Sequence, residues 1–372
     1  MVKKNSAMGI VFANAHDELV KELAEQRAMG SLPFGGRYRL IDFTLSNLYN
    51  ADIDKVGLIT KSNYQSLMRH IGSGKSWDLA RKNGGLYLLP PFAHSDRGVY
   101  HGQVDALGGI RSFLTEAHRD YVVLCDADVV SNVDIKKMLR SHVDSGADIT
   151  IACKRGAAPA GDDVMKLTTA GDGRVTDIEL APEAGGDCLF SIDITIISRN
   201  LLIKLVDDAM RHSYTRLAAD IYQRKLGELD IRAYEVDGYV AVIDSVETFI
   251  RANMKLLDRD VRRELLCSDR PVLTHVRNEM PVKYGLNCDV KNSLIADGCV
   301  IEGTVENCVL FRGVKVGKGA VLRNCIVMEG TEIGENCDMQ YVCVDKEVTV
   351  RDYKTLYGSE SYYVYIRKAS VV

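Results

Sequence analysis

The stretch GIVFANAHDEL (Gly9 to Leu19) decides how the first part of the chain folds. The apolar run from Met8 to Phe12 predicts a buried first strand. A phosphate-binding turn would be expected directly after such a strand. That kind of turn needs glycines, because only glycine lets successive backbone N–H groups close on a phosphate without a Cβ in the way. The turn from Ala13 to Glu18 has no glycine and no arginine, and it carries two acids. We therefore predict a strand followed by a turn that repels a triphosphate.

Strand and helix patterns alternate over residues 1–265. The expected strands are Gly9–Phe12, Lys55–Thr60, Tyr121–Cys125, Asp148–Cys153, Arg174–Glu179, Asp193–Ser198 and Ile231–Glu235. The expected helices between them include Gln103–Ala117, Asp134–Asp144 and Val246–Asp258. This alternation predicts an α/β domain with a mostly parallel sheet covered on both faces, and with ligands outside the carboxyl ends of the strands.

The pattern of apolar residues changes from about residue 287 onward. Apolar residues recur every five or six positions and are often followed by glycine or another small residue, as in Val316-Gly317 and Ile333-Gly334. This period predicts a left-handed parallel β-helix with triangular coils of about eighteen residues, and an irregular β-sandwich is the alternative. We therefore divide the chain into a domain of residues 1–265, a linker of residues 266–286, and a β-helix of residues 287–372 with a C-terminal strand. A β-helix this short has exposed ends that must be capped or paired, which favours an oligomer.

Composition and charge narrow the function classes. The chain has 372 residues, of which 46% are hydrophobic and 26% charged, and a formal net charge of −4. Such a charge gives no electrostatic reason to expect nucleic acid or an anionic membrane as a partner. The sequence has no signal-like N-terminus and no apolar run near twenty residues, so we expect a cytoplasmic protein. Ten cysteines without a C-x-x-C pair predict reduced, apolar packing residues instead of a zinc site or disulfides.

Three segments carry a resemblance to a known family. They are PFGGRYRLIDFTLSN (Pro33 to Asn47), VGLITKSNYQSLMRHI (Val56 to Ile71) and YHGQVDAL (Tyr100 to Leu107). In this order and spacing they resemble ADP-glucose pyrophosphorylase, also called glucose-1-phosphate adenylyltransferase, and the likeness covers nearly the whole chain. The resemblance implies a Rossmann-like, GT-A-like nucleotidyltransferase domain followed by the left-handed β-helix. It also implies a reaction that moves AMP from ATP onto glucose 1-phosphate, in which two polyanions must be neutralised and positioned.

The positions that carry chemistry in the family are the ones that differ here. The family's Gly-rich loop falls on Phe12 to Leu19, so that Ala15 and Asp17 stand among positions held by glycine and arginine. The family's remaining catalytic positions, which are two lysines and two metal-binding aspartates, are occupied here by Met29, Ala181, Ala127 and Val242. The resemblance therefore implies an adenylyltransferase scaffold without catalytic residues, cofactor or metal.

Other residues with binding chemistry are kept. Arg37 and Arg39 alternate on a segment expected to be extended, so both guanidinium groups project to one side and offer a site for an anion. In the family, the arginine matching Arg39 lies in the region that binds phosphorylated effectors. Arg27 is kept from a neighbouring motif, and we assign it with Arg37 and Arg39 to the binding of an effector phosphate. A salt bridge is the alternative role for the pair. His101, Gly102, Gln103 and Asp105 keep part of a nucleotide-facing loop, which we interpret as a vestigial pocket of structural value.

Taken together, these features predict a non-catalytic regulatory subunit that pairs with a homologous catalytic ADP-glucose pyrophosphorylase subunit, as a heterotetramer, and responds to a phosphorylated metabolite. One rival is an active sugar nucleotidyltransferase with a rearranged site, in which Asp126, Asp128 and Asp244 hold magnesium. Another is a sensor of sugar phosphates or nucleotides that uses Arg37 and Arg39 without a partner. Asp126 and Asp128 could instead be solvated carboxylates in a turn, without any metal. His16 stands beside Asp17, but we do not expect an acid–base pair there, since sequence neighbours seldom face each other. A hexapeptide acyltransferase is disfavoured because no histidine follows His275.

Overall fold

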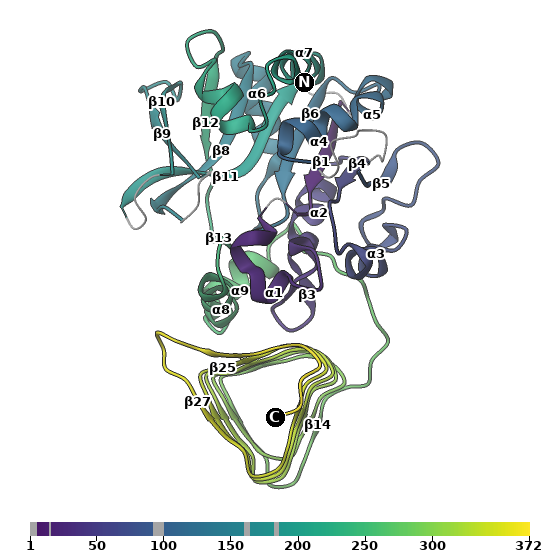
Figure 1. The fold of residues 1–372 in the computed structure, drawn as a ribbon, viewed down its shortest axis with the longest axis vertical. Helices are drawn as coiled ribbons and strands as arrows, with labels where there is room; N and C mark the ends of the chain where they lie inside the picture. Colours follow the sequence, from purple (N-terminus) through teal and green to yellow (C-terminus); the bar gives the residue numbers. More distant parts are fainter. Residues whose placement is uncertain (1–5, 15, 92–99, 160–163, 182–185) are drawn as a thin grey trace.

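The computed structural model describes residues 6–14, 16–91, 100–159, 164–181 and 186–372, and it shows an α/β domain stacked on a triangular coil of strands (Figure 1). The main sheet of the α/β domain contains β1 (Ala7–Phe12), β4 (Lys55–Ile59), β5 (Gly85–Leu89), β6 (Tyr121–Asp126), β8 (Ile149–Ala157), β9 (Met165–Thr169), β10 (Val175–Leu180), β11 (Asp187–Ser198) and β12 (Ile231–Glu235). Its order is β10-β9-β11-β6-β1-β4-β5, with β8 beside β11 and β12 beside β8. β1 therefore lies inside the sheet, between β4 and β6.

The sheet is mixed, so the prediction of a mostly parallel sheet is wrong on one side. β1 pairs in parallel with β4 and β6, and β4 with β5. The long strand β11, however, runs antiparallel to β6, β8 and β9. Four strands from β8 to β11 follow one another without a helix among the described residues between them, and strands joined without a crossover helix pair antiparallel. The alternation that predicted parallel pairing therefore holds only outside residues 149–198.

Two hydrophobic cores cover the two faces of this sheet. Alternate residues of β1 divide between them: Met8, Ile10 and Phe12 face one core, and Ala7 and Val11 face the other. The first core is closed by α4 (Gln103–Gly109), α5 (Arg111–Glu116), α7 (Arg199–Arg211) and a π-helical turn (Leu217–Gln223). The second is closed by α2 (Leu40–Asn50), α3 (Gln65–Ile71) and α6 (Ile135–Ser145).

The helix expected over Gln103–Ala117 is divided into α4 and α5. α4 ends at Gly109, and Ile110 leaves the helical conformation. Gly108 and Gly109 are poor helix formers, and they stand where the predicted helix is interrupted. Gly108 faces α7, where its nearest neighbours are side-chain atoms of Met210.

A third layer joins the α/β domain to the β-helix. It contains η1 (Asp17–Val20), α1 (Lys21–Ala24), η2 (Met29–Ser31), β2 (Pro33–Phe34), β3 (Tyr38–Arg39), β7 (Val129–Ser131), β13 (Val240–Val242), α8 (Val246–Lys255) and α9 (Arg259–Leu266). The short helix η3 (Lys75–Trp77) places Trp77 in the second core of the sheet instead. Within the core of the third layer, Phe34 and Phe249 pack in one cluster with Val309, Phe311 and Ile326 of the β-helix. The two domains therefore share apolar core at their junction.

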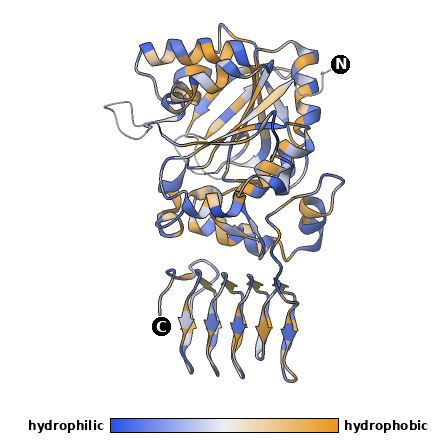
Figure 2. Cartoon of the chain, turned by 90° about the vertical axis from the view of Figure 1, so that its right-hand side faces the viewer, coloured by the Kyte–Doolittle hydropathy of each residue, from blue (hydrophilic) through white to orange (hydrophobic). Residues whose placement is uncertain are grey.

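The C-terminal part is a left-handed parallel β-helix with three five-stranded sheets, seen nearly end-on in Figure 1 and from the side in Figure 2. One sheet holds β14 (Lys283–Tyr284), β17 (Val300–Ile301), β20 (Lys315–Val316), β23 (Glu332–Ile333) and β26 (Thr349–Val350). The second holds β15 (Asp289–Lys291), β18 (Thr304–Glu306), β21 (Val321–Arg323), β24 (Asp338–Gln340) and β27 (Thr355–Tyr357). The third holds β16 (Leu294–Ile295), β19 (Val309–Leu310), β22 (Ile326–Val327), β25 (Val342–Val344) and β28 (Val364–Ile366).

The coils are shorter than the eighteen residues expected. Ile301 pairs with Val316, Val316 with Ile333 and Ile333 with Val350, so one repeat takes 15 residues and the next two take 17. Asn307 and Asn324 occupy corresponding left-handed positions, which asparagine tolerates better than most residues, so that a corner turns in fewer residues. The first strand of the coil, β14, lies inside the segment 266–286 that was predicted as a linker. At the other end β28 pairs in parallel with β25, so the C-terminal strand belongs to the solenoid.

Two further expectations concern cysteines and membranes. All ten cysteines are free thiols, and seven of them are buried, as expected for apolar packing residues. Among the described residues, the helices are too short or too polar to cross a membrane.

Candidate functional site

The turn after β1 is held by its own polar groups. The backbone N–H of Ala13 donates to the carbonyl of Ile59. The side chain of Asn14 donates to the carbonyl of Ser62 and accepts from the backbone N–H of Lys61 at 2.9 Å. The N–H of Ala13 and the side chain of Asn14 are therefore already paired within the protein. Ala15, one of the predicted positions, lies outside the described residues.

Asp17 faces the protein backbone. One of its carboxylate oxygens accepts the N–H of Met29 at 2.8 Å, and the other accepts from the side chain of Asn14 at 2.5 Å. Burial raises the pKa of Asp17 above its ordinary value, although these two hydrogen bonds act against that shift. The acid thus fastens the turn to the segment that carries Met29, and it places negative charge where the family binds phosphates.

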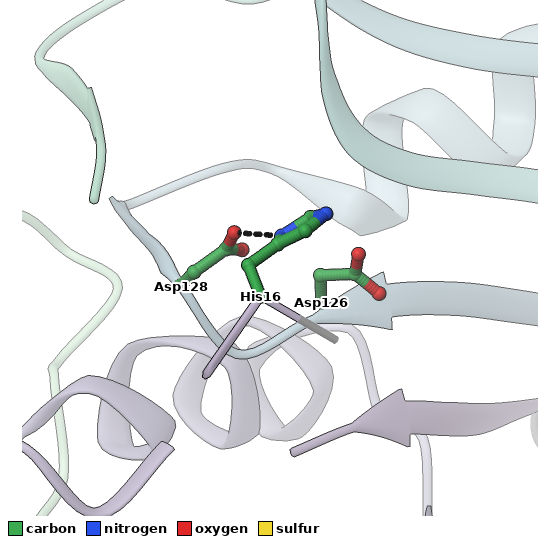
Figure 3. Close-up of side chains that lie close together, drawn as sticks. All are labelled: His16, Asp126 and Asp128. Carbon is green, nitrogen blue, oxygen red and sulfur yellow. Dashed lines mark hydrogen bonds and ion pairs between the residues drawn. The ribbon is translucent and has the colours of Figure 1, made fainter. Parts of the chain in front are cut away.

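His16 pairs with an acid 112 positions away, not with Asp17. Its Nδ1 lies 2.5 Å from Oδ2 of Asp128, which follows β6, and Asp126 at the end of β6 lies beside it (Figure 3). Burial acts to lower the pKa of His16, but the charge and hydrogen bond of Asp128, with Asp126 and Asp193, outweigh burial, and the pKa lies well above its ordinary value. The surrounding carboxylates therefore favour the protonated form of the imidazole. The sequence carries no signal for this pair, because contact across 112 residues depends on the packing of β1 against β6.

The residues at the family's chemical positions have apolar side chains, and three of the four are buried or half-buried. Met29 and Ala127 are buried, and the N–H of Ala127 donates to the carbonyl of Phe12. Val242 is half-buried in β13, opposite Val129. Ala181 is exposed directly after β10, with a φ of 49°. A lysine or an aspartate is replaced at each of these positions by a side chain that offers no charge and no oxygen.

A cavity of about 240 Å³ remains next to the turn after β1. His101, Gly102 and Gln103 line it, together with Lys61 and Arg216. Gly102 is required by space, because a Cβ there would lie 2.3 Å from the carbonyl oxygen of Thr215. Asp105 lies beside the cavity and accepts the N–H of His101. Three of the four residues predicted for the vestigial pocket therefore line this cavity, and Asp105 does not.

A second cleft lies where the α/β domain meets the β-helix. Arg37 and Arg39 both line it, and residues that the sequence did not point to complete it: Arg277, Arg312, Glu329 and Lys346. These come from the linker and from the β-helix, so only the docking of the two domains assembles the cleft. Arg27, grouped with Arg37 and Arg39 in the prediction, does not line it. Its guanidinium group is buried and paired with Asp345, which makes it a contact between domains.

The charge of this cleft is strongly positive and partly buried. Glu329 pairs with Arg277 and with Lys346, which lies 2.8 Å away. Burial lowers the pKa of Lys346 to about 8, with the neighbouring Arg39 acting in the same direction, and burial lowers that of Arg39 to about 10. Arg312 is 7% exposed, and its Nε and Nη2 have no hydrogen-bond partner among the described residues. Such unpaired, desolvated donors favour an anionic ligand.

Comparison with known proteins places this scaffold in a family. A sequence model described as nucleotidyl transferase matches residues 19–183, and one described as GlmU-like, C-terminal hexapeptide matches residues 281–360. The glycogen biosynthesis protein GlgD of Bacillus subtilis strain 168 is 36% identical over 99% of this chain and 97% of its own length. The chain belongs to the GlgD and glucose-1-phosphate adenylyltransferase family. Within this family, GlgD of Geobacillus stearothermophilus is 36% identical over 86% of this chain and 83% of its own. The glucose-1-phosphate adenylyltransferase of that organism is 33% identical over 86% and 84%.

The magnesium site that the adenylyltransferase family implies does not fit the residues present. Its two carboxylates fall on Ala127 and Val242, which have no oxygen to offer. Asp244, the nearest acid in sequence to Val242, accepts a hydrogen bond from the hydroxyl of Thr248 at 2.8 Å. It is not a member of the group formed by His16, Asp126 and Asp128. The described residues therefore do not assemble the rearranged set of Asp126, Asp128 and Asp244.

Proposed function

We propose that this chain is a non-catalytic regulatory subunit of bacterial ADP-glucose pyrophosphorylase, acting in glycogen biosynthesis in the cytoplasm. It would pair with a homologous catalytic subunit and raise its activity. One observation carries the proposal: a complete adenylyltransferase scaffold has apolar side chains at its chemical positions and an acid fastened inside its phosphate-binding turn. Its relatives include both GlgD proteins and glucose-1-phosphate adenylyltransferases.

The electrostatics of the turn support the absence of catalysis. Adenylyl transfer brings a nucleoside triphosphate and a sugar phosphate together, and the charge on both must be neutralised in the transition state. In this chain the region carries the acids Asp17, Asp126 and Asp128. The basic side chains near them are His16 and, on the cavity wall, Lys61 and Arg216. The backbone donors that family members gain from glycines are replaced by residues bonded to one another.

The cleft between the domains supports a regulatory role. Four arginines and Lys346 surround one acid, Glu329, at the junction of the α/β domain and the β-helix. An anion bound there contacts both domains at once, so it favours whichever arrangement brings the cations together. A ligand can shift a conformational equilibrium only through such differential contact. We take the anion to be a phosphorylated metabolite.

Sulfate is expected to bind this cleft below pH 8 and to be lost as the pH rises. The pKa of Lys346 is about 8, so its charge is present below that pH and disappears above it, whereas sulfate keeps its charge throughout. In calorimetric titrations between pH 6.5 and 9, Arg312→Ala is expected to weaken sulfate binding about tenfold or more, since a hydrogen bond to a charged group contributes about 1.5–3 kcal/mol. Lys346→Arg should remove the pH dependence. Equal affinity for the wild type and Arg312→Ala would exclude the cleft as the anion site.

The first coil of the β-helix supports a subunit contact. Its open end exposes apolar side chains, including Met280, which is 81% exposed, and Leu286, which is fully exposed. Strand edges and apolar groups left open in this way are usually covered by a partner. Because the catalytic subunit resembles this chain, its own β-helix can stack on the same end, and two such pairs give the heterotetramer that we propose.

Sedimentation tests the partnership. A mixture of this chain with the glucose-1-phosphate adenylyltransferase of the same organism is expected to sediment as one species larger than either chain alone. Met280→Glu combined with Leu286→Glu should weaken that species, since two charges would be buried at the contact. A matched double change on the exposed face of the other domain, Tyr87→Glu with Met68→Glu, should leave it intact. Separate sedimentation of the wild-type chains would contradict the proposal.

A further inference from the structure

We propose that His16, Asp126 and Asp128 bind a divalent transition-metal ion of the zinc and manganese type. The site lies at the carboxyl ends of β1 and β6, where the turn after β1 meets the turn after β6. One ligand atom from each of the three residues lies within 4.8 Å of the other two. Figure 3 shows the imidazole of His16 standing between the two carboxylates. The inference is independent of the regulatory role, which requires no ion.

Burial and an unpaired oxygen point to a ligand at this place. Asp126 is 3% exposed and Asp128 is 2% exposed. Oδ2 of Asp128 bonds to His16, but Oδ1 is buried and has no hydrogen-bond partner among the described residues. A buried carboxylate oxygen without a donor is unfavourable, and a cation supplies the missing interaction. Three carboxylates, those of Asp126, Asp128 and Asp193, also act together on the imidazole and attract positive charge to the same point.

The donor set selects the kind of ion. Zinc and manganese accept imidazole nitrogen together with carboxylate oxygen, whereas magnesium prefers oxygen ligands alone. Ligand bonds of about 2.0–2.2 Å place the donor atoms of one ion about 3–4 Å apart. Small rotations of the three side chains would bring their ligand atoms to this separation. His16 would bind as the neutral imidazole, and the ion would take the place of the proton between Nδ1 and Asp128. The histidine ligand distinguishes this site from a site made of two aspartates.

The ion would fix the turn that stands where phosphates bind in the family. His16 belongs to that turn, whereas Asp126 is the last residue of β6 and Asp128 lies two residues beyond it. Asp17, the next residue, is already bonded to the N–H of Met29. The turn is thus already held on one side, by the bond of Asp17 to Met29. A metal at His16 would hold it on the other side as well, by joining it to the end of β6. The site would then have a structural role. Metal affinity and thermal stability, and not the rate of a reaction, would show whether it exists.

Cobalt binding tests the site. The full chain is freed of metal with a chelator and titrated with Co²⁺, whose visible absorption reports nitrogen and oxygen coordination. We expect one equivalent of Co²⁺ per chain, competed by Zn²⁺ and not by an equal concentration of Mg²⁺, and a higher melting temperature with Zn²⁺. His16→Ala and Asp128→Asn should each weaken binding by about 100-fold or more, because loss of an outer partner alone already costs 10–100-fold.

The control is His212→Ala, which removes an exposed histidine that stacks on Tyr214 and should leave the cobalt spectrum unchanged. Circular dichroism shows whether each variant is folded, and Asp128→Asn, which keeps the shape of the side chain, serves if His16→Ala does not fold. Absence of the cobalt spectrum in the wild type would overturn the inference and leave His16 and Asp128 as an ion pair only. Equal binding in the wild type and both site variants, or equal competition by Mg²⁺, would also overturn it.

Discussion

Replacing Asp345 by asparagine is expected to lower the free energy of unfolding by about 3–5 kcal/mol, because it leaves the guanidinium group of Arg27 buried without its partner. The side chains of Arg27 and Asp345 are 5% and 2% exposed, and they join the α/β domain to the β-helix. The hydroxyl of Tyr365 donates to the same carboxylate oxygen at 2.7 Å, and the N–H of Lys346 donates to the other. Urea denaturation followed by circular dichroism measures the change.

Two comparisons separate charge burial from loss of a contact. Asp297→Asn breaks the exposed pair with Arg37, whose atoms are 4.0 Å apart, and should change the free energy of unfolding by less than about 1 kcal/mol. Arg27→Met combined with Asp345→Leu removes both charges and should recover most of the stability that Asp345→Asn loses. An effect of Asp345→Asn no larger than that of Asp297→Asn would show that the buried pair does not hold the domains together.

The second large effect concerns catalysis. The isolated chain is expected to exchange pyrophosphate into ATP, with glucose 1-phosphate present, at least about 10⁴-fold more slowly than a glucose-1-phosphate adenylyltransferase. Loss of one oxyanion-stabilising donor typically costs about 10²–10³ in kcat, and several losses within one catalytic unit do not simply add. Here the glycines, both lysines and both metal carboxylates are missing.

Variants decide what any residual exchange would mean. If the rival interpretation of a rearranged active site were correct, Asp126→Asn and Asp128→Asn would abolish the exchange, since both carboxylates would hold the metal. If a contaminating enzyme causes the residual exchange, the two variants and the wild type will show the same low rate of pyrophosphate exchange. Exchange by the wild type within 10²-fold of an adenylyltransferase, lost in both variants, would contradict a non-catalytic subunit.

The sequence predicted the parts of the fold that have a local signal. β1 and β6 are apolar runs, and the recurrence of Val316, Ile333 and their neighbours predicted the β-helix. The antiparallel direction of β11 was missed. No residue in β11 indicates this direction; it follows from the succession of strands without helices between them. Coil length was overestimated, because the corners at Asn307 and Asn324 are tighter than the regular hexapeptide period.

The candidate sites divide in the same way. Met29 and Ala127 were singled out because motifs similar to those of the family give them fixed places in the chain, and the structure shows both as buried apolar side chains. The pairing of His16 with Asp128 and the contribution of Arg312 and Lys346 to the cleft could not be found, because these contacts join segments that only tertiary packing brings together. Arg27 was assigned to an anion site from its motif, but its partner Asp345 lies 318 positions away and neutralises it within the protein.

The decisive measurement is the rate of ADP-glucose formation by the catalytic subunit as increasing amounts of this chain are added. We expect no synthesis by this chain alone, and a rise in kcat/KM of the catalytic subunit that saturates when the two chains are present in a fixed ratio. A rate that stays constant over the whole titration, or synthesis by this chain in the absence of the catalytic subunit, would contradict the proposal of a non-catalytic regulatory subunit.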